Sequence, residues 1–291
     1  MISSKLNTSS PLRADRRFAA LLSGASYLTL LLVLLVLAFL VREAAPVLRH
    51  SGFGLVSDSN WQPLEGHFGV LYMLLATLAA ALGAVVVATP IGLASAIFQR
   101  FYATKRIARL HRMVLALLSG IPSVVYGLWG LTVLVPIIAH IRPPGTSLLA
   151  AILVLALMIL PTVALASASA LAAVPEGWLQ AAAALGLTRK GEILFVAVPA
   201  ARAGILGGVL LALARALGET MAVLMVAGNV VQAPFGALES VRVLTANIAL
   251  EMAYAGGDHR SGLFASGLLL TVLVLLLAWL AARVTEPVQH V

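Results

Sequence analysis

The stretch that decides the fold is residues 18–41, FAALLSGASYLTLLLVLLVLAFLV. It contains no charged residue, and it exceeds the roughly 20 apolar residues that a helix needs to cross a bilayer core of about 30 Å. It is also longer than the apolar core of a signal peptide, about 7 to 15 residues, and no small-residue cleavage site follows it. We therefore expect a retained first transmembrane helix, preceded by a polar segment at residues 1–17.

The rest of the chain has the same character. Of its 291 residues, 61% are hydrophobic and 10% are charged, and the mean hydropathy of +1.04 excludes an ordinary soluble domain. Further apolar runs lie at residues 69–97, 113–139, 147–169, 202–228 and 262–283. They are continuous rather than alternating, which favours helices over the strands of a barrel. The sequence predicts an all-α, polytopic membrane protein with about six transmembrane helices.

The positions of the 19 Lys and Arg residues predict the orientation. With the N-terminus inside, most of them fall in short cytoplasmic segments, as the positive-inside rule requires. The net charge of +8 is thus spread along membrane boundaries, which argues against a nucleic-acid binder. We expect both termini in the cytoplasm, a periplasmic loop at residues 42–68 and a short cytoplasmic tail at residues 285–291.

The longest predicted cytoplasmic loop, residues 170–201, contains the stretch LQAAAALGLTRKG at residues 179–191. Its small, helix-forming residues end at Gly186, which predicts a short surface helix closed by a glycine cap. A second segment, residues 192–198, is expected to stop at Pro199. Such a helix could lie in a groove of another protein, or the segment could be an ordinary loop.

Enzymatic chemistry is not expected in this chain. None of its lysines follows a glycine, so it lacks the phosphate-binding loop G-x-x-x-x-G-K-[ST]. It has no cysteine, and its histidines lack the spacing of metal ligands. Its carboxylates are few and separated. We predict no catalytic residue, no metal site and no cofactor held by the chain itself.

The fifth predicted span contains two charged residues in the stretch RALGETMAV, residues 215–223. On a continuous helix Arg215 and Glu219 share a face and can pair. A charge at the bilayer centre costs about 2.5 to 3.5 kcal/mol, so both should face the bundle or a wet cavity. In one interpretation they neutralise each other and fix the helix register. In the other they line a path on which the Arg215 guanidinium meets a passing oxyanion.

Small residues, prolines and hydroxyl residues in the predicted spans could shape the packing of the helices or line the path. A small-residue stripe that lets helices approach closely recurs at Gly204, Gly208, Ala212 and Ala216. Prolines that can kink a helix lie at Pro90, Pro122, Pro136 and Pro161. Hydroxyls that could line the same path as Arg215 belong to Ser123, Tyr126 and Thr220, with ordinary helix packing as the alternative.

The cytoplasmic loop resembles the coupling motif of ABC importer permeases, a Glu-Ala-Ala triplet followed by a glycine and, further on, by Ile-x-Leu-Pro. The matching residues here are Gln180, Ala181, Ala182, Gly186 and, in the closing Val-Ala-Val-Pro, Pro199. The resemblance implies that these residues dock against a separate ATPase. Gln180 departs from the family pattern, because glutamine keeps the length and the acceptor oxygen of glutamate but lacks its charge.

A second resemblance rests on residues 215–223, on Gly228-Asn229, and on IPSVVYGLWG at residues 121–130. Together they resemble the PstC-type permeases of phosphate-specific ABC importers, within the binding-protein-dependent transport permeases. The likeness implies a MetI-like transmembrane domain over residues 69–284 and a phosphate pathway past the charged and hydroxyl residues named above. Sulfate and molybdate permeases carry similar strings, so they remain the alternative within the class.

The same resemblance implies partners and a location. It predicts a second, homologous permease of the PstA type, a dimeric ATP-binding subunit of the PstB type that holds ATP and Mg, and an external phosphate-binding protein of the PstS type. The complex would lie in a bacterial inner membrane and work by alternating access. A secondary transporter or an anion channel, which would need no ATPase, is the alternative from another class.

Overall fold

The structure, a computed structural model, describes residues 13–285, so most of the predicted polar N-terminal segment and of the C-terminal tail lies outside the described residues. The helices are α1 (Arg13–Ser51), α2 (Gly54–Ser57), α3 (Leu71–Ile97), α4 (Lys105–Gly120), α5 (Ser123–Trp129), α6 (Val135–Ala139), α7 (Leu148–Ala172), α8 (Glu176–Ala184), α9 (Arg189–Gly191), α10 (Val198–Ala200), α11 (Arg202–Leu217), α12 (Met221–Val226), α13 (Leu244–Glu251) and α14 (Gly257–Thr285). Shorter elements are the strands β1 (Trp61–Gln62) and β2 (His67–Phe68), the 3₁₀ turn η1 (Pro63–Glu65) and the π-helical turns η2 (Phe98–Tyr102), η3 (Gly130–Leu134) and η4 (Glu192–Ala197). The prediction of an all-α protein is confirmed.

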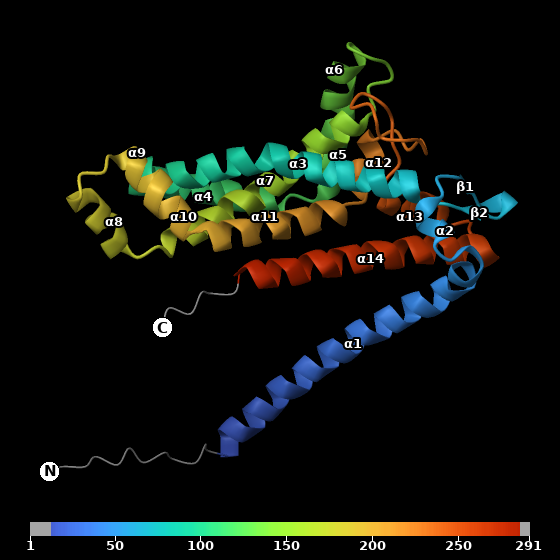
Figure 1. The fold of residues 1–291 in the computed structure, drawn as a ribbon, viewed down its shortest axis with the longest axis horizontal. Helices are drawn as coiled ribbons and strands as arrows, with labels where there is room; N and C mark the ends of the chain where they lie inside the picture. The colour runs from blue at the N-terminus through green and yellow to red at the C-terminus, as the bar shows by residue number, and fades with distance from the viewer. Residues whose placement is uncertain (1–12, 286–291) are drawn as a thin grey trace.

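Helices α3, α7 and α11 lie side by side and form the centre of the bundle, with α14 alongside them (Figure 1). Small side chains let these helices approach closely, as the stripe on α11 predicts. A Cβ atom placed on Gly204 would lie 2.7 Å from the Cβ of Ala170, and one on Gly208 would lie 2.4 Å from the Cβ of Ala166, both on α7. Van der Waals packing of this kind is the main attraction between helices in lipid.

Within residues 13–285, four helices are long and apolar enough to cross a membrane, or up to six if each of two bent pairs counts as one span. The third predicted span, residues 113–139, is not a straight helix. Helix α4 already begins at Lys105, and Ser123–Ala139 is turned from it by 90°. The bend falls where Ile121 is extended, with φ −67° and ψ 130°, a conformation favoured because a following proline disfavours helical geometry.

The fifth predicted span, residues 202–228, is also interrupted. Helix α11 ends at Leu217, and α12 begins at Met221 after a break at residues 218–220. On the other side, the helical segment Arg189–Ala200 meets α11 at a bend of 67°. The segment expected to stop at Pro199 therefore continues to Ala200. A proline is tolerated in the first turn of a helix, and α10 contains Pro199 in that position.

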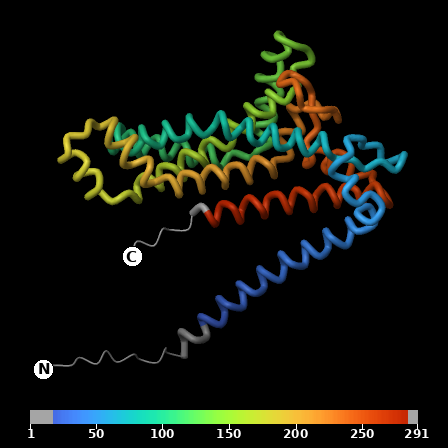
Figure 2. Tube along the Cα trace, in the orientation of Figure 1, coloured from blue at the N-terminus to red at the C-terminus, as the bar shows by residue number. Residues whose placement is uncertain are grey.

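Helix α1 continues ten residues beyond the predicted end at Val41, so the predicted periplasmic loop at residues 42–68 begins as helix. The reason is an apolar cluster at this end of the molecule. Ala44 and Val47 are 0% and 1% exposed, and they belong to the cluster that also includes Trp61. The earlier part of α1 diverges from α14 (Figure 2). The apolar side chains of that part of α1 are exposed in the isolated chain.

Candidate functional site

The interruption between α11 and α12 is a helix break stabilised by Glu219. One Glu219 carboxylate oxygen accepts a hydrogen bond from the backbone N–H of Ala222 at 3.2 Å and so caps the first turn of α12. The carbonyl of Glu219 accepts a hydrogen bond from the Thr245 hydroxyl at 2.8 Å. A glycine at 218 favours a break here, since glycine is about 1 kcal/mol less favourable than alanine inside a helix.

Arg215 lies in the last turn of α11 and is exposed in the isolated chain. Among residues 13–285, no hydrogen bond or ion pair to its guanidinium is found, and none joins it to Glu219. The interpretation in which the two residues neutralise each other finds no support in this arrangement. The helix ends between them, so the regular four-residue spacing that would bring the side chains together is lost.

Residues 121–130 and 215–223, which carry the resemblance to PstC-type permeases, pack against each other. A Cβ atom placed on Gly127 would lie 2.8 Å from the Cα of Ala222, so α5 and α12 approach closely enough to exclude any side chain at 127. Gly130 is similarly tight, since its Cβ would lie 2.5 Å from a methyl group of Val154 on α7. Residues 121–130 therefore support α12, the part of the broken span that follows Glu219.

The hydroxyl residues predicted for the path lie in this region, but their contacts differ. Tyr126 is buried, and its hydroxyl donates to the carbonyl of Leu118 at 2.8 Å, which ties α5 to α4 across the 90° bend. Ser123 is half-buried at the start of α5. The Thr220 hydroxyl lies 3.4 Å from the carbonyl of Gly218, within the break itself. A role of these residues in a path stays a prediction.

The predicted surface helix of the cytoplasmic loop is confirmed as α8. Its end has two bonds of the Schellman motif, from the Gly186 N–H to the Ala183 carbonyl at 3.0 Å and from the Leu187 N–H to the Ala182 carbonyl at 3.2 Å. Gly186 has φ +83°, which a residue with a Cβ rarely adopts. The sequence therefore predicted both the helix and the residue that closes it.

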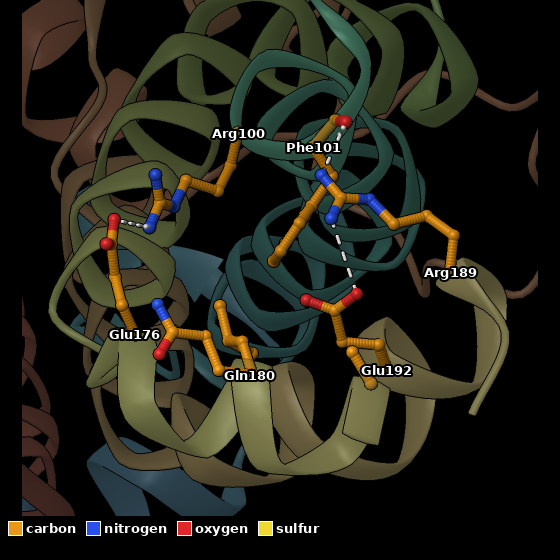
Figure 3. Close-up of a pocket in the computed structure, with 8 residues that line it drawn as sticks. Arg100, Phe101, Glu176, Gln180, Arg189 and Glu192 are labelled. Carbon is orange, nitrogen blue, oxygen red and sulfur yellow. Dashed lines mark hydrogen bonds and ion pairs between the residues drawn. The ribbon is translucent and has the colours of Figure 1, made fainter. Parts of the chain in front are cut away.

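A pocket of about 310 Å³ lies between α8 and η2, and Gln180 points into it (Figure 3). Two ion pairs border the pocket, Arg100 with Glu176 at 3.6 Å and Arg189 with Glu192 at 3.3 Å. Arg189 also donates to the carbonyl of Phe101 at 2.9 Å, which fixes the turn after α8 against η2.

The other predicted coupling residues lie on different faces of this region. Ala181, Gly186 and Pro199 are exposed. Ala182 is only 5% exposed and packs inward, so it supports α8 rather than offering contact area. A role of these residues in docking stays a prediction.

A second cluster of charged groups, which the sequence does not reveal, surrounds Glu251 at the opposite end of the molecule. The carboxylate, 8% exposed, accepts from Arg242 Nη1 at 2.8 Å and from Trp61 Nε1 at 2.9 Å, and it lies 2.8 Å from His259 Nε2. Arg242 also donates to Asn247 at 3.0 Å. The three partners of Glu251 come from three separate segments, so no local pattern could identify them. Among the described residues, no group that could hold a metal ion occurs.

Comparisons with known proteins agree with this architecture. Residues 88–288 match the family described as binding-protein-dependent transport system inner membrane component. A probable ABC transporter permease protein, YqgH of Bacillus subtilis strain 168, is 38% identical over 256 residues, which are 84% of this chain and 81% of that protein. The phosphate transport system permease protein PstC of Mesorhizobium japonicum is 33% identical over 289 residues, 92% of this chain and 88% of that protein.

An inward-facing structure of the MetNI methionine ABC transporter has the same fold, with a TM-score of 0.61 at 20% identity over 78% of this chain and 98% of that chain. The MetI-like fold predicted from the resemblance is therefore confirmed. The family match spans most of the chain, and relatives above 30% identity cover more still. The chain belongs to the family of binding-protein-dependent transport system inner membrane components, the permease subunits of ABC transporters.

Proposed function

We propose that the chain is the permease subunit through which an ATP-driven importer moves inorganic phosphate into the cytoplasm. The names of the relatives support phosphate as the substrate, because several PstC proteins are 32% to 34% identical to this chain over most of its length. The proposal places both termini in the cytoplasm of a bacterial cell, in agreement with the distribution of Lys and Arg.

The observation that carries the proposal is the unpaired Arg215. A guanidinium within a span is expensive unless it meets an anion or water, and the carboxylate nearest in sequence is occupied with capping α12. Arg215 is therefore available to donate two hydrogen bonds to a tetrahedral oxyanion. Phosphate would pass Arg215 on the face of α11 that the isolated chain leaves exposed, where we place the second permease of the complex.

Energy in this scheme comes from the partner subunits. We place the ATPase dimer, with its ATP and Mg, against the exposed side of α8 and the turn at Gly186. Closure of that dimer would push α8, and the fixed contact of Arg189 with Phe101 would pass the motion to η2 and α3. An external phosphate-binding protein would deliver the anion at the end of the molecule that carries β1 and β2.

The direct test is phosphate uptake by the assembled complex with Arg215→Ala. Losing one charge-assisted contact of about 1.5 to 3 kcal/mol should lower uptake about tenfold or more while the amount of assembled complex is unchanged. Arg283→Ala is the matched control, because that guanidinium lies over the Trp279 ring at the far end of α14. Equal losses of uptake and of assembled protein would contradict a role of Arg215 in the path.

Coupling is tested separately with Gly186→Val. A β-branched residue at φ +83° strains the turn by about 1 to 2 kcal/mol and should displace the end of α8, so ATP-driven uptake should fall and the ATPase should dissociate more easily. Gly177→Ala, in the same helix with open space around it, is the control. Unchanged uptake with Gly186→Val would remove the docking assignment.

Two measurements distinguish the rival functions. Competition of phosphate, sulfate and molybdate for uptake identifies the oxyanion. Phosphate flux through the purified chain alone in vesicles, without ATP, would replace the proposal with an ATP-independent transporter or channel.

A further inference from the structure

Helix α13 inserts between the external end of α3 and the break in the fifth span. Its first residue, Leu244, donates its backbone N–H to the Thr77 hydroxyl on α3 at 3.0 Å. The next residue, Thr245, donates its hydroxyl to the carbonyl of Glu219 at 2.8 Å. Thr77 and Thr245 are 4% and 7% exposed, so both bonds are shielded from competing water.

The hydrogen bond at the helix break has a distant donor. Thr245 lies 26 residues after Glu219 in the sequence. A carbonyl at a helix break has lost its regular backbone donor and needs another partner. Within residues 13–285, the Thr245 hydroxyl is the donor found for the Glu219 carbonyl. This contact therefore fixes the backbone of Glu219, and with it the direction of the carboxylate that caps α12.

Helix α13 is itself held from the external side. Arg242, just before α13, contacts both Asn247 and Glu251 within it, and Glu251 is bound in turn by Trp61 and His259. Arg242 Nε also donates to the carbonyl of Asn229 at 2.9 Å. Helix α13 thus links two sets of hydrogen bonds, one around Glu251 and one from Thr245 to Glu219.

We propose that Thr245 is a positioning residue for transport, and that it keeps Arg215 free by preventing α11 from continuing through residues 218–220. If the Thr245 bond is lost, the chain can form a regular helix across the break. Glu219 then comes to lie four residues after Arg215 on one helix face, where the two charges pair and the guanidinium is no longer available to an anion. The inference rests on the proposed function, because it assumes that a free Arg215 is what transport requires.

The first test uses the whole transporter complex with Thr245→Val, which keeps the side-chain volume but removes the hydroxyl. Loss of one neutral hydrogen bond should lower the maximal rate of phosphate uptake about two- to tenfold, whereas Thr245→Ser should remain near the wild-type rate. Thr271→Val is the matched control, because its hydroxyl makes a bond of the same 2.8 Å length, but to Gly267 within one helix.

The second test does not depend on transport. In the Thr245→Val complex, the backbone amides of Thr220, Met221 and Val223 should exchange hydrogen more slowly, because the re-formed helix would give them the backbone acceptors that the break denies them. Equal or faster exchange at these amides would overturn the inference, since a merely loosened structure exchanges faster.

The two sets of results separate the inference from the function on which it rests. If Arg215→Ala lowers uptake while Thr245→Val changes neither uptake nor exchange, the positioning role falls and the proposed function stands. If neither substitution changes uptake, the assumption that transport requires a free Arg215 falls, and the positioning role falls with it. The proposed function itself would fall if the unmodified complex took up no phosphate. Slower exchange with unchanged uptake in Thr245→Val would likewise reject the positioning role, because pairing would then not matter for transport.

Discussion

Two arginines in this chain have opposite surroundings. Arg242, at the end of the molecule that carries β1 and β2, makes hydrogen bonds to Glu251, Asn247 and the carbonyl of Asn229. Arg215, in the fifth span, is exposed on the isolated chain and has no such partner within residues 13–285. A partly buried arginine with several hydrogen bonds holds segments together, whereas an unpaired one within a span is available to a group that the chain itself does not provide.

The largest effect in this comparison is expected from Glu251→Ala. Removing the carboxylate leaves Arg242 partly buried without its counter-charge, which destabilises a protein by about 3 to 5 kcal/mol. We expect a large decrease in the thermal unfolding midpoint of the detergent-purified chain. Glu239→Ala is the control, because its 3.6 Å pair with Arg142 is largely exposed and contributes about 0 to 1 kcal/mol. Equal shifts in the two variants would refute the distinction between the regions.

A smaller effect is expected from Trp61→Phe, which sharpens the comparison by removing one donor to Glu251 and leaving the ion pair intact. A hydrogen bond to a charged group contributes about 1.5 to 3 kcal/mol, and the aromatic ring is retained for packing against Phe68. The unfolding midpoint should decrease by less than in Glu251→Ala. A midpoint equal to that of the wild type would show that Trp61 acts in the cluster through packing alone.

The smallest change in stability is expected from Arg215→Ala. With no partner to lose among the described residues, the substitution should change the free energy of unfolding by no more than about 0.5 kcal/mol. The same denaturation measurement checks it. A loss comparable to that of Glu251→Ala would mean that Arg215 is a structural residue like Arg242, and the comparison would no longer hold.

Much of the fold could be predicted because the bilayer imposes a length and a composition on each span. The runs at residues 69–97, 147–169 and 262–283 correspond closely to α3, α7 and α14. The two bent spans could not be located in this way, since an apolar count does not report the direction of the backbone. Pro122 gave a local signal for the bend of 90°, and Pro199 lies just before the bend of 67° between Ala200 and Arg202. Gly218 gave only a weak signal for the break between α11 and α12.

The site was predictable where the relevant interactions are local. Gly186 closes α8 through bonds to residues just before it, so a sequence motif is sufficient to identify it. The interpretation in which Arg215 pairs with Glu219 assumed an unbroken helix, and the sequence does not reveal that Thr245, from a distant segment, bonds to the break. The Glu251 cluster likewise depends on distant segments, because Trp61 and His259 are brought to Glu251 only by the tertiary fold.

The close approach of Gly127 to Ala222 has a consequence for engineering related permeases. Because the backbones touch, residues 121–130 and 215–223 behave as one transplantable module. A chimera that exchanged only one of the two stretches would bring mismatched surfaces together and fail to assemble. Transfer of this region between permeases would therefore require both stretches to be moved at once.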